Sequence, residues 1–308
     1  MKIAKKHLVI LLAVLSMGLS SCNSWVYDST SGCDMGVYVH LYSKTPCATD
    51  TIYPTTITDY SVFVFDEQSR LAAIKRVKKE SLDSDNKVQI PLLTPGLYSV
   101  IAWAGITPEL VESQLKLGKT HKKDVFLKLK DAEAISLPKS LALYVGLSEP
   151  FLVGYGDDTD TYKETSVNLR ELSNRIQVSI EDIPDAEKYQ VSIESMNGTY
   201  SLLGEVIKDK SINYQPYLRE VGDDSLTESF SLLKLVTGHN SVLTIKRDEE
   251  VLYQEDLLGT ILLKNPMVNL KCDNDFSIRF KVRESCACVE IWVNDWLIHS
   301  YETEVGPW

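Results

Sequence analysis

The sequence lacks the residue patterns of common catalytic sites. It contains five histidines, and none lies three or four residues from another, so the spacing of a helical zinc site does not occur. It has no Gly-x-Ser-x-Gly turn, no glycine-rich phosphate loop and no dinucleotide-binding fingerprint. We therefore expect no catalytic residues, no metal and no cofactor, and we predict that the protein is not an enzyme.

Positive charge is also scarce. The chain has 32 lysines and arginines against 43 aspartates and glutamates, which gives a formal net charge of −11. Proteins that bind phosphate backbones need a basic surface. The composition therefore argues against nucleic acid as a partner.

Only one long apolar run is present, and it lies at the N-terminus. Lys2, Lys5 and Lys6 precede apolar residues 8–19, and residues 19–22 read LSSC. The run is shorter than the ~20 residues of a membrane-spanning helix and has the three regions of a secretory signal. LSSC resembles the lipobox of bacterial lipoproteins, which predicts cleavage before Cys22 and attachment of diacylglycerol and palmitate to it. The alternative is an ordinary secretory signal in which Cys22 is coincidental.

Loss of the three signal lysines changes the formal charge from −11 to −14. The mature chain is long enough for two domains of ~100–200 residues. We predict a lipoprotein signal peptide at 1–21, a lipidated tether at 22–35, an N-terminal β-sandwich at 36–170 and a C-terminal β-sandwich at 171–308.

Short segments rich in β-branched and aromatic residues recur between turn residues, which is typical of an all-β sandwich. One segment, 108–117, has helical composition and an early proline. Residues 147–165 are predicted to be rich in loop, 197–198 (NG) to form a hairpin turn, and 294–295 (ND) to form the turn of a closing hairpin. Strands are predicted at 37–42, 60–65, 71–77, 87–92, 97–104, 125–130, 175–181, 189–194, 230–236, 242–247, 276–282, 288–293 and 296–298.

Lipidation of Cys22 would leave five cysteines, an odd number that requires a free thiol or an intermolecular bond. We take Cys33 with Cys47 as the best intrachain pair. Cys286 and Cys288 lie two apart in a predicted strand and point the same way, so they do not readily bond to each other. Burial as small apolar side chains suits them better than metal binding.

Three further features have two interpretations each. The acidic residues 156–160 (GDDTD) fit either a calcium loop or a solvated loop, of which we favour the second. Residues 197–199 (NGT) fit a glycosylation signal or a turn, and we favour the turn. The tryptophans could line a glycan site; Trp103 suits the core, whereas Trp25 and Trp308 are freer to meet a partner.

Several motifs together resemble the FimB-type anchor lipoproteins of type V fimbriae. They are the lipobox followed by 25–28 (WVYD) and a cysteine, 37–39 (VYV), 60–66 (YSVFVFD), 95–105 (PGLYSVIAWAG) and 289–296 (VEIWVNDW). The last is similar to the family's closing Val-Asn-Gly-Trp hairpin, except that Asp295 replaces the turn glycine.

The resemblance implies two tandem transthyretin-like β-sandwiches on an outer-membrane, surface-exposed lipoprotein. It also implies that the chain binds the basal shaft subunit, holds the shaft to the cell and limits its length. In related shaft and tip subunits an arginine-specific protease removes the first strand. Here Lys44 is the only lysine or arginine between Cys22 and Arg70, so the chain is expected to stay on its lipid. The competing hypothesis is a surface glycan- or nutrient-binding lipoprotein of an uptake system.

Overall fold

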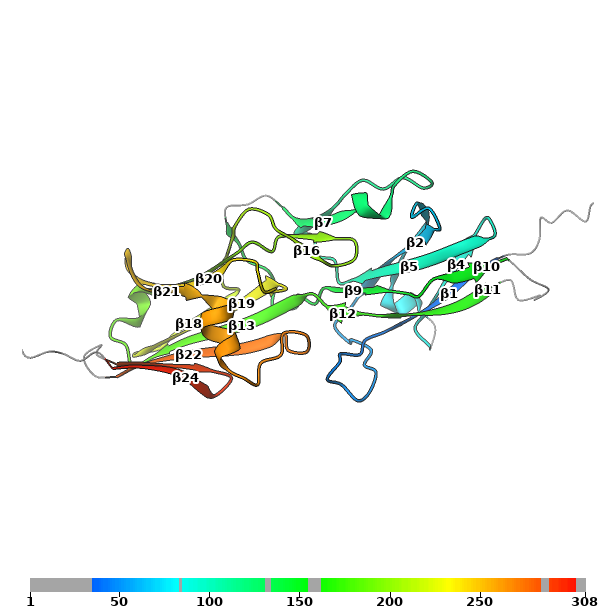
Figure 1. Ribbon diagram of the computed structural model, residues 1–308. Helices are drawn as coiled ribbons and strands as arrows, with labels where there is room; N and C mark the ends of the chain where they lie inside the picture. Colours follow the sequence, from blue (N-terminus) through cyan, green and yellow to red (C-terminus); the bar gives the residue numbers. More distant parts are fainter. Residues whose placement is uncertain (1–34, 83–84, 131–133, 155–161, 284–287, 303–308) are drawn as a thin grey trace, which may run out of the picture.

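The computed structural model describes residues 35–82, 85–130, 134–154, 162–283 and 288–302, and almost all of its regular structure is β-strand. The molecule is elongated, with β1 near one end and β24 near the other (Figure 1). The expected all-β class with stacked sheets is confirmed. The predictions for Cys22, Trp25, Cys33, the acidic residues 156–160, Cys286 and Trp308 concern residues outside the described ranges.

The strands follow the predicted segments closely, and short additional strands connect them. Their bounds are β1 (Met35–Tyr42), β2 (Asp59–Asp66), β3 (Leu71–Lys78), β4 (Lys87–Leu92), β5 (Gly96–Ala104), β6 (Leu110–Glu112), β7 (Phe126–Leu129), β8 (Ala134–Ile135), β9 (Tyr144–Leu147), β10 (Phe151–Val153), β11 (Tyr162–Asn168), β12 (Arg170–Glu171), β13 (Ser173–Glu181), β14 (Tyr189–Ser195), β15 (Thr199–Ser201), β16 (Val206–Ile207), β17 (Ile212–Tyr214), β18 (Leu218–Val221), β19 (Ser225–Leu233), β20 (Ser241–Arg247), β21 (Glu250–Asp256), β22 (Asp275–Arg283), β23 (Cys288–Val293) and β24 (Trp296–Glu302).

The N-terminal half is built around β2 and β5, which are apolar on both faces. Side chains of a strand alternate between its faces. Val62 and Val100 face a core shared with the β11-β1-β4 sheet, whereas Phe63 and Trp103 face a second, larger core. This double burial explains why the segments read as continuous apolar runs.

The C-terminal half is a sandwich of a six-stranded and a five-stranded sheet. The strand orders are β18-β19-β13-β22-β23-β24 and β21-β20-β14-β17-β8. Ile176 and Phe230 of the first sheet and Ile193 and Leu243 of the second are fully or almost fully buried in the same core cluster. Alternation of apolar and polar residues in β13 and β14 places one face of each strand in this core.

The two halves exchange strands. β6 and β7, from the first half, form one sheet with β15 and β16, from the second, and β8 pairs in parallel with β17. The division near residue 170 stays a prediction. Any such division has to leave β7 and β8 paired with β15 and β17, which belong to the second half.

The helix predicted at 108–117 is wrong, because β6 lies there and pairs with β7 through Leu110 and Leu129. A ten-residue helix is marginal on its own, and strand pairing overrides its composition. The helical structure that joins β21 to β22 is instead η4 (Leu257–Ile261) and η5 (Leu262–Lys264). Asp256 caps η4 by accepting the backbone N–H of Gly259.

Two turn predictions have opposite outcomes. Asn294 and Asp295 have φ of 47° and 62°, as a type I′ turn between β23 and β24 requires. Asn197 and Gly198 do not close a hairpin, because β14 pairs with β20 and β17, whereas β15 pairs with β7 and β16. Asn197 is buried, donates to the carbonyl oxygen of Leu233 and accepts the Tyr214 hydroxyl. Its amide therefore holds the short connection by which the chain passes from the sheet of β14 to the sheet of β15.

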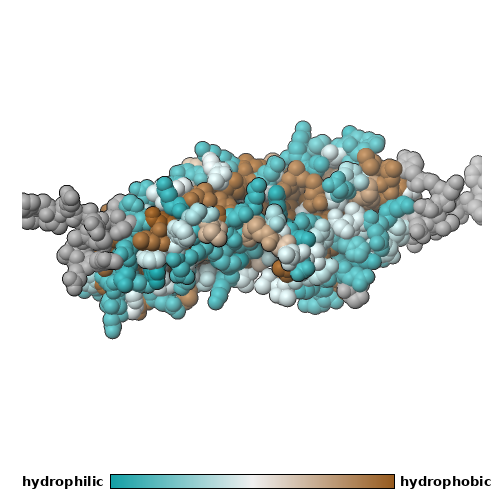
Figure 2. Space-filling view, turned by 60° about the horizontal axis from the view of Figure 1, so that its bottom comes forward, coloured by the Kyte–Doolittle hydropathy of each residue, from teal (hydrophilic) through white to brown (hydrophobic). Residues whose placement is uncertain are grey.

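The loop prediction for 147–165 is also wrong in part, since β10 lies inside it and β11 begins at Tyr162. β11 pairs in parallel with β1 over its whole length. On the face shown in Figure 2 hydrophilic residues predominate, and hydrophobic residues gather in separate patches. Within the described ranges no helix is long and apolar enough to cross a membrane.

Candidate functional site: two ends and a bonded junction

The chain enters the fold at one end of the molecule and leaves it at the other. β1 begins at Met35, beside Gly154 and Pro95, and β24 runs along the opposite part of the molecule (Figure 1). Cys22 precedes Met35 by roughly a dozen residues, a length of chain that can span about 40 Å when extended. A lipid on Cys22 would therefore lie within about 40 Å of the start of β1.

β1 is a central strand that is bonded on both sides. It pairs in parallel with β11 and antiparallel with β4, and Val37, Val39 and Leu41 are buried. Gly36 has no space for a side chain, because a Cβ there would lie 2.2 Å from the carbonyl oxygen of Ile90. The first strand is thus an integral part of the sandwich.

Trp103 joins the two halves in the interior. It is 1% exposed, and its indole Nε1 donates to the carbonyl oxygen of Leu202 at 2.8 Å. Its ring lies 5.9 Å from that of Tyr200, whose hydroxyl donates to the carbonyl oxygen of Leu172 and accepts the backbone N–H of Lys234. Burial raises the pKa of Tyr200 well above its usual value, so this hydroxyl stays protonated.

The shared sheet adds a second connection. Tyr200 in β15 pairs with Leu127 in β7. Asp209 reinforces this pairing because it accepts the Thr199 hydroxyl at 2.7 Å and lies 3.2 Å from the ammonium group of Lys128. The hydrogen bond from Thr199, followed by that from the backbone of Lys210, lowers the pKa of Asp209 to about 2.

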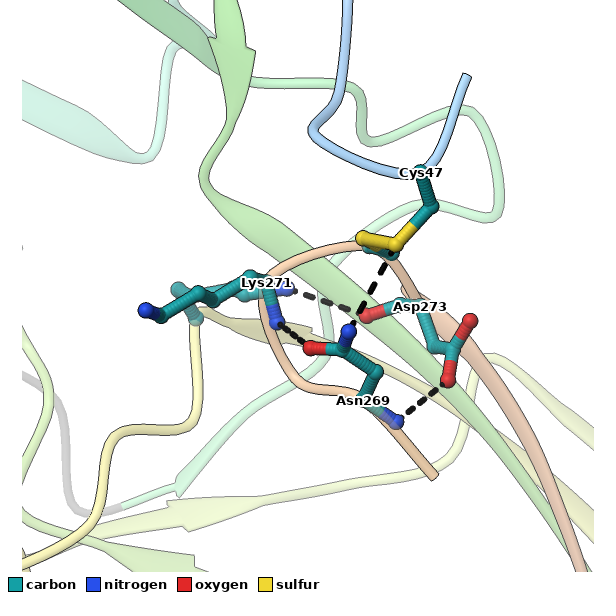
Figure 3. Close-up of a disulfide and its surroundings, with 6 residues drawn as sticks. Cys47, Asn269, Lys271 and Asp273 are labelled. Carbon is teal, nitrogen blue, oxygen red and sulfur yellow. Dashed lines mark hydrogen bonds between the residues drawn. A yellow bond between two sulfur atoms is a disulfide. The ribbon is translucent and has the colours of Figure 1, made fainter. Parts of the chain in front are cut away.

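A disulfide bond forms the third connection. Cys47, in the loop after β1, is bonded to Cys272, in the loop before β22, with the two Cα atoms 6.0 Å apart (Figure 3). Asn269 holds the second loop by donating to the Cys47 sulfur and accepting the backbone N–H of Lys271. The predicted pairing of Cys33 with Cys47 is therefore wrong, since β1 carries Cys47 away from Met35 to the junction.

A cleft of about 870 Å³ opens beside the disulfide at the junction. Its lining includes two strands that end their sheets, β12 and β16, the two loops that the disulfide joins, and the segment that follows β19. Cationic residues outnumber acidic ones in its lining, by four to two, and the acidic residues are Glu171 and Glu205. The cationic residues are Lys44, Arg170, Lys234 and Lys271.

Sequence reasoning missed this cleft. Its cations come from four distant segments, and no motif connects them. The one available signal was that Lys44 is isolated in a long stretch without basic residues. Only the fold brings it to Lys234.

The other predicted features are separate from the cleft. Trp103 lies in the core as predicted. The Cζ atom of Arg279 lies 5.1 Å from the ring centroid of Trp292. Trp296, at the start of β24, is 48% exposed. No group of three or more potential metal-ligating side chains occurs in the part of the chain that the structure describes.

Comparison with known proteins agrees with this architecture. Residues 30–302 match the family described as fimbrillin-A associated anchor proteins Mfa1 and Mfa2. The chain belongs to this family. The minor fimbrium anchoring subunit Mfa2 of Porphyromonas gingivalis is 34% identical over 322 residues, covering 98% of this chain and 99% of the relative.

Solved structures of the anchor family and of more distant proteins share the fold. The Mfa2 structure from P. gingivalis has a TM-score of 0.78 at 33% identity and covers 87% of this chain and 99% of its own. A Bacteroides ovatus protein has a TM-score of 0.73 at 19% identity and covers 88% and 97%, which shows the fold alone. The FimB-type resemblance noted in the sequence is thus confirmed at the level of the anchor family.

Proposed function

We propose that this protein is a structural, outer-membrane lipoprotein that anchors a fimbrial shaft to the cell surface, binds its basal subunit and limits its length. The relative that matches it over nearly its whole length is named as an anchoring subunit. Lipid on Cys22 would provide the membrane attachment. Acyl chains on one cysteine give stable anchoring when two or more are present.

The observation that carries the proposal is the position of the first basic residues. A shaft-type subunit would lose its first strand to cleavage after an arginine. Arg70 lies beyond β2, where its backbone N–H is held by Asp66. Cleavage there would separate β1 and also the central strand β2 from the core, which would not leave a folded subunit. The chain is therefore suited to remain joined to its N-terminus.

The junction supports the same function. An anchor carries load between the membrane and the shaft, which here corresponds to the direction from Met35 toward β24. Along that direction the two halves are connected by the buried Trp103, by the β7–β15 pairing and by a covalent bond between Cys47 and Cys272. Tension would have to break these connections before the halves could separate.

We place the contact with the basal shaft subunit at the end opposite Met35. β24 is the terminal strand of its sheet and pairs with β23 alone among the described strands. An exposed strand edge can take up an added strand from a partner, with main-chain hydrogen bonds giving strength and side-chain pockets giving selectivity.

Deletion of the gene tests the function directly: fimbriae should assemble, detach into the medium and exceed normal length.

A further inference from the structure

We propose that the cleft at the junction binds an extended, acidic segment of a partner protein. The inference rests on the proposed function only in taking the partner to be a protein. It is carried by the charge balance of the cleft, by its apolar lining and by the strand edges in its walls.

Four cationic and two acidic residues line the cleft, and of the acidic ones Glu171 is already engaged whereas Glu205 forms no ion pair among the described residues. Glu171 binds Arg175 at 2.6 Å and also accepts Ser173 and Asn274. Asp275 binds Arg175 as well. In the described part of the chain, Lys44, Arg170 and Lys271 form no ion pair, and all three are exposed. The cleft therefore presents positive charge on a protein whose net charge is strongly negative.

Lys234 is the most enclosed of these cations. Its ammonium group donates to the carbonyl oxygen of Asp273 at 3.1 Å and to Asn274 Oδ1 at 2.5 Å, neither of which is a negative charge. Burial lowers the pKa of Lys234 to about 8, although Glu171, Asp273 and Asp275 oppose that effect and Arg175 adds to it. A carboxylate placed in the cleft would stabilise the charged form.

The rest of the lining identifies the class of ligand. Apolar residues line the cleft together with the cations, and no aromatic residue is among its described lining residues; the apolar ones are Pro46, Leu172, Val206, Val236 and Leu270. Glycan sites usually offer an aromatic face, and phosphate sites need little apolar surface. Carboxylates interleaved with apolar side chains match an acidic peptide.

The walls also suit an extended chain. Arg170 belongs to β12, which pairs with β9, and Val206 belongs to β16, which pairs with β15; each ends its sheet. A second hollow of about 330 Å³ continues the cleft and shares Asn168, Arg170 and Glu205 with it. A peptide could thus lie along the cleft and bond to a free strand edge.

Fluorescence anisotropy with the purified mature chain tests the inference. The probe is a labelled short peptide that alternates glutamate with leucine, and its matched control alternates glutamine with leucine. The acidic peptide should bind, more weakly at high salt, and the neutral one at least about tenfold more weakly. Arg170→Gln and Lys271→Gln, both at exposed positions, should each weaken binding of the acidic peptide by several-fold, whereas Lys119→Gln, exposed and outside the cleft, should not.

Lys234 supplies a readout that a structural role would not give. Peptide affinity of the unmodified chain should fall as the pH rises through about 8, because the neutral amine attracts no carboxylate. Lys234→Arg should bind at all these pH values without that fall. Equal binding of the two peptides, insensitivity to both glutamine variants, or equally effective competition by inorganic phosphate or polygalacturonate would overturn the assignment. Each of these results would leave anchoring unaffected, because anchoring is measured by fimbrial retention on cells.

Discussion

The indole nitrogen of Trp103 and the carbonyl oxygen of Leu202 meet at 2.8 Å in the buried interior, although the two residues belong to different halves of the chain. Trp103 lies in β5, and Leu202 directly follows β15. A buried carbonyl needs a partner, so neither half satisfies this site by itself. We therefore expect the halves to unfold together.

Replacing Trp103 by phenylalanine should destabilise the whole protein. The substitution keeps most of the apolar ring and leaves the Leu202 carbonyl without a donor, at a cost of about 1–3 kcal/mol in the free energy of unfolding. Urea unfolding monitored by circular dichroism measures it. Trp296→Phe, at a 48% exposed position, is the control and should change stability by less than about 0.5 kcal/mol. Two separate transitions in the unmodified protein would refute the shared junction.

Removing the disulfide should also weaken the junction. It connects residues 225 positions apart, and loss of a native disulfide commonly costs about 2–5 kcal/mol, chiefly because the unfolded chain gains freedom. We expect the Cys47→Ser, Cys272→Ser double variant to match the reduced form of the unmodified chain in its urea midpoint. If reduction leaves the midpoint unchanged, the bond adds no stability.

Acid should weaken the β7–β15 pairing through Asp209. Its pKa is lowered to about 2 by the Thr199 hydroxyl and the Lys210 backbone, so its contribution is complete above the unfolded value of 3.8 and is lost as the pH falls through about 2. Asp209→Asn should lower stability at neutral pH by about 1 kcal/mol and flatten the decline between pH 4 and pH 2. Asp223→Asn, at an exposed turn position, should do neither.

Strands were predictable here where one segment carries its own pattern. The alternation in β13 and the double-sided burial of β2 follow from local sequence, as does the Asn294-Asp295 turn. The errors all involve distant partners. Residues 108–117 form a strand because β7 offers an edge, and Asn197 makes a buried crossover because Leu233 and Tyr214 accept and donate to its amide.

The cleft and the disulfide could not be predicted for the same reason. Cys47 bonds to Cys272, and Lys44 lines the same cleft as Lys234, only after β1 and β22 are placed in their sheets. Cys33 is close to Cys47 in the sequence, whereas Cys272, its partner in the structure, is 225 positions away. Chain topology decides such pairings, and topology is not a local property.

Lys44→Arg should create a release site for an arginine-specific protease. Lys44 is exposed directly after β1, but Asn168 holds it by accepting its backbone N–H at 2.8 Å and donating to its carbonyl oxygen at 3.0 Å. Cleavage of the variant should therefore be slow, and faster when Asn168→Ala is added. Immunoblots of culture medium with and without the protease measure release. If the cut chain stays on cells, pairing of β1 with β4 and β11 is sufficient to retain it.

The lipid itself is tested by Cys22→Ala. Because Cys22 is not among the residues that form the two described cores, the variant should keep the unfolding midpoint of the unmodified chain and lose membrane attachment. Metabolic acyl labelling followed by fractionation and high-salt washing measures this.

In a strain that lacks the gene, the variant should fail to restore retention of fimbriae on cells, whereas the unmodified chain should restore both retention and normal length. The reason is that a lipidated subunit that keeps its first strand can occupy only the base of the polymer, and a base that stops growth fixes length as well as attachment. Cys33→Ala is the matched control, since it removes a cysteine other than the predicted lipidation site and leaves the disulfide in place. Electron microscopy of cells and immunoblots of the medium for shaft protein give the outcome, and normal retention with Cys22→Ala would mean that the shaft is held by something other than this lipid.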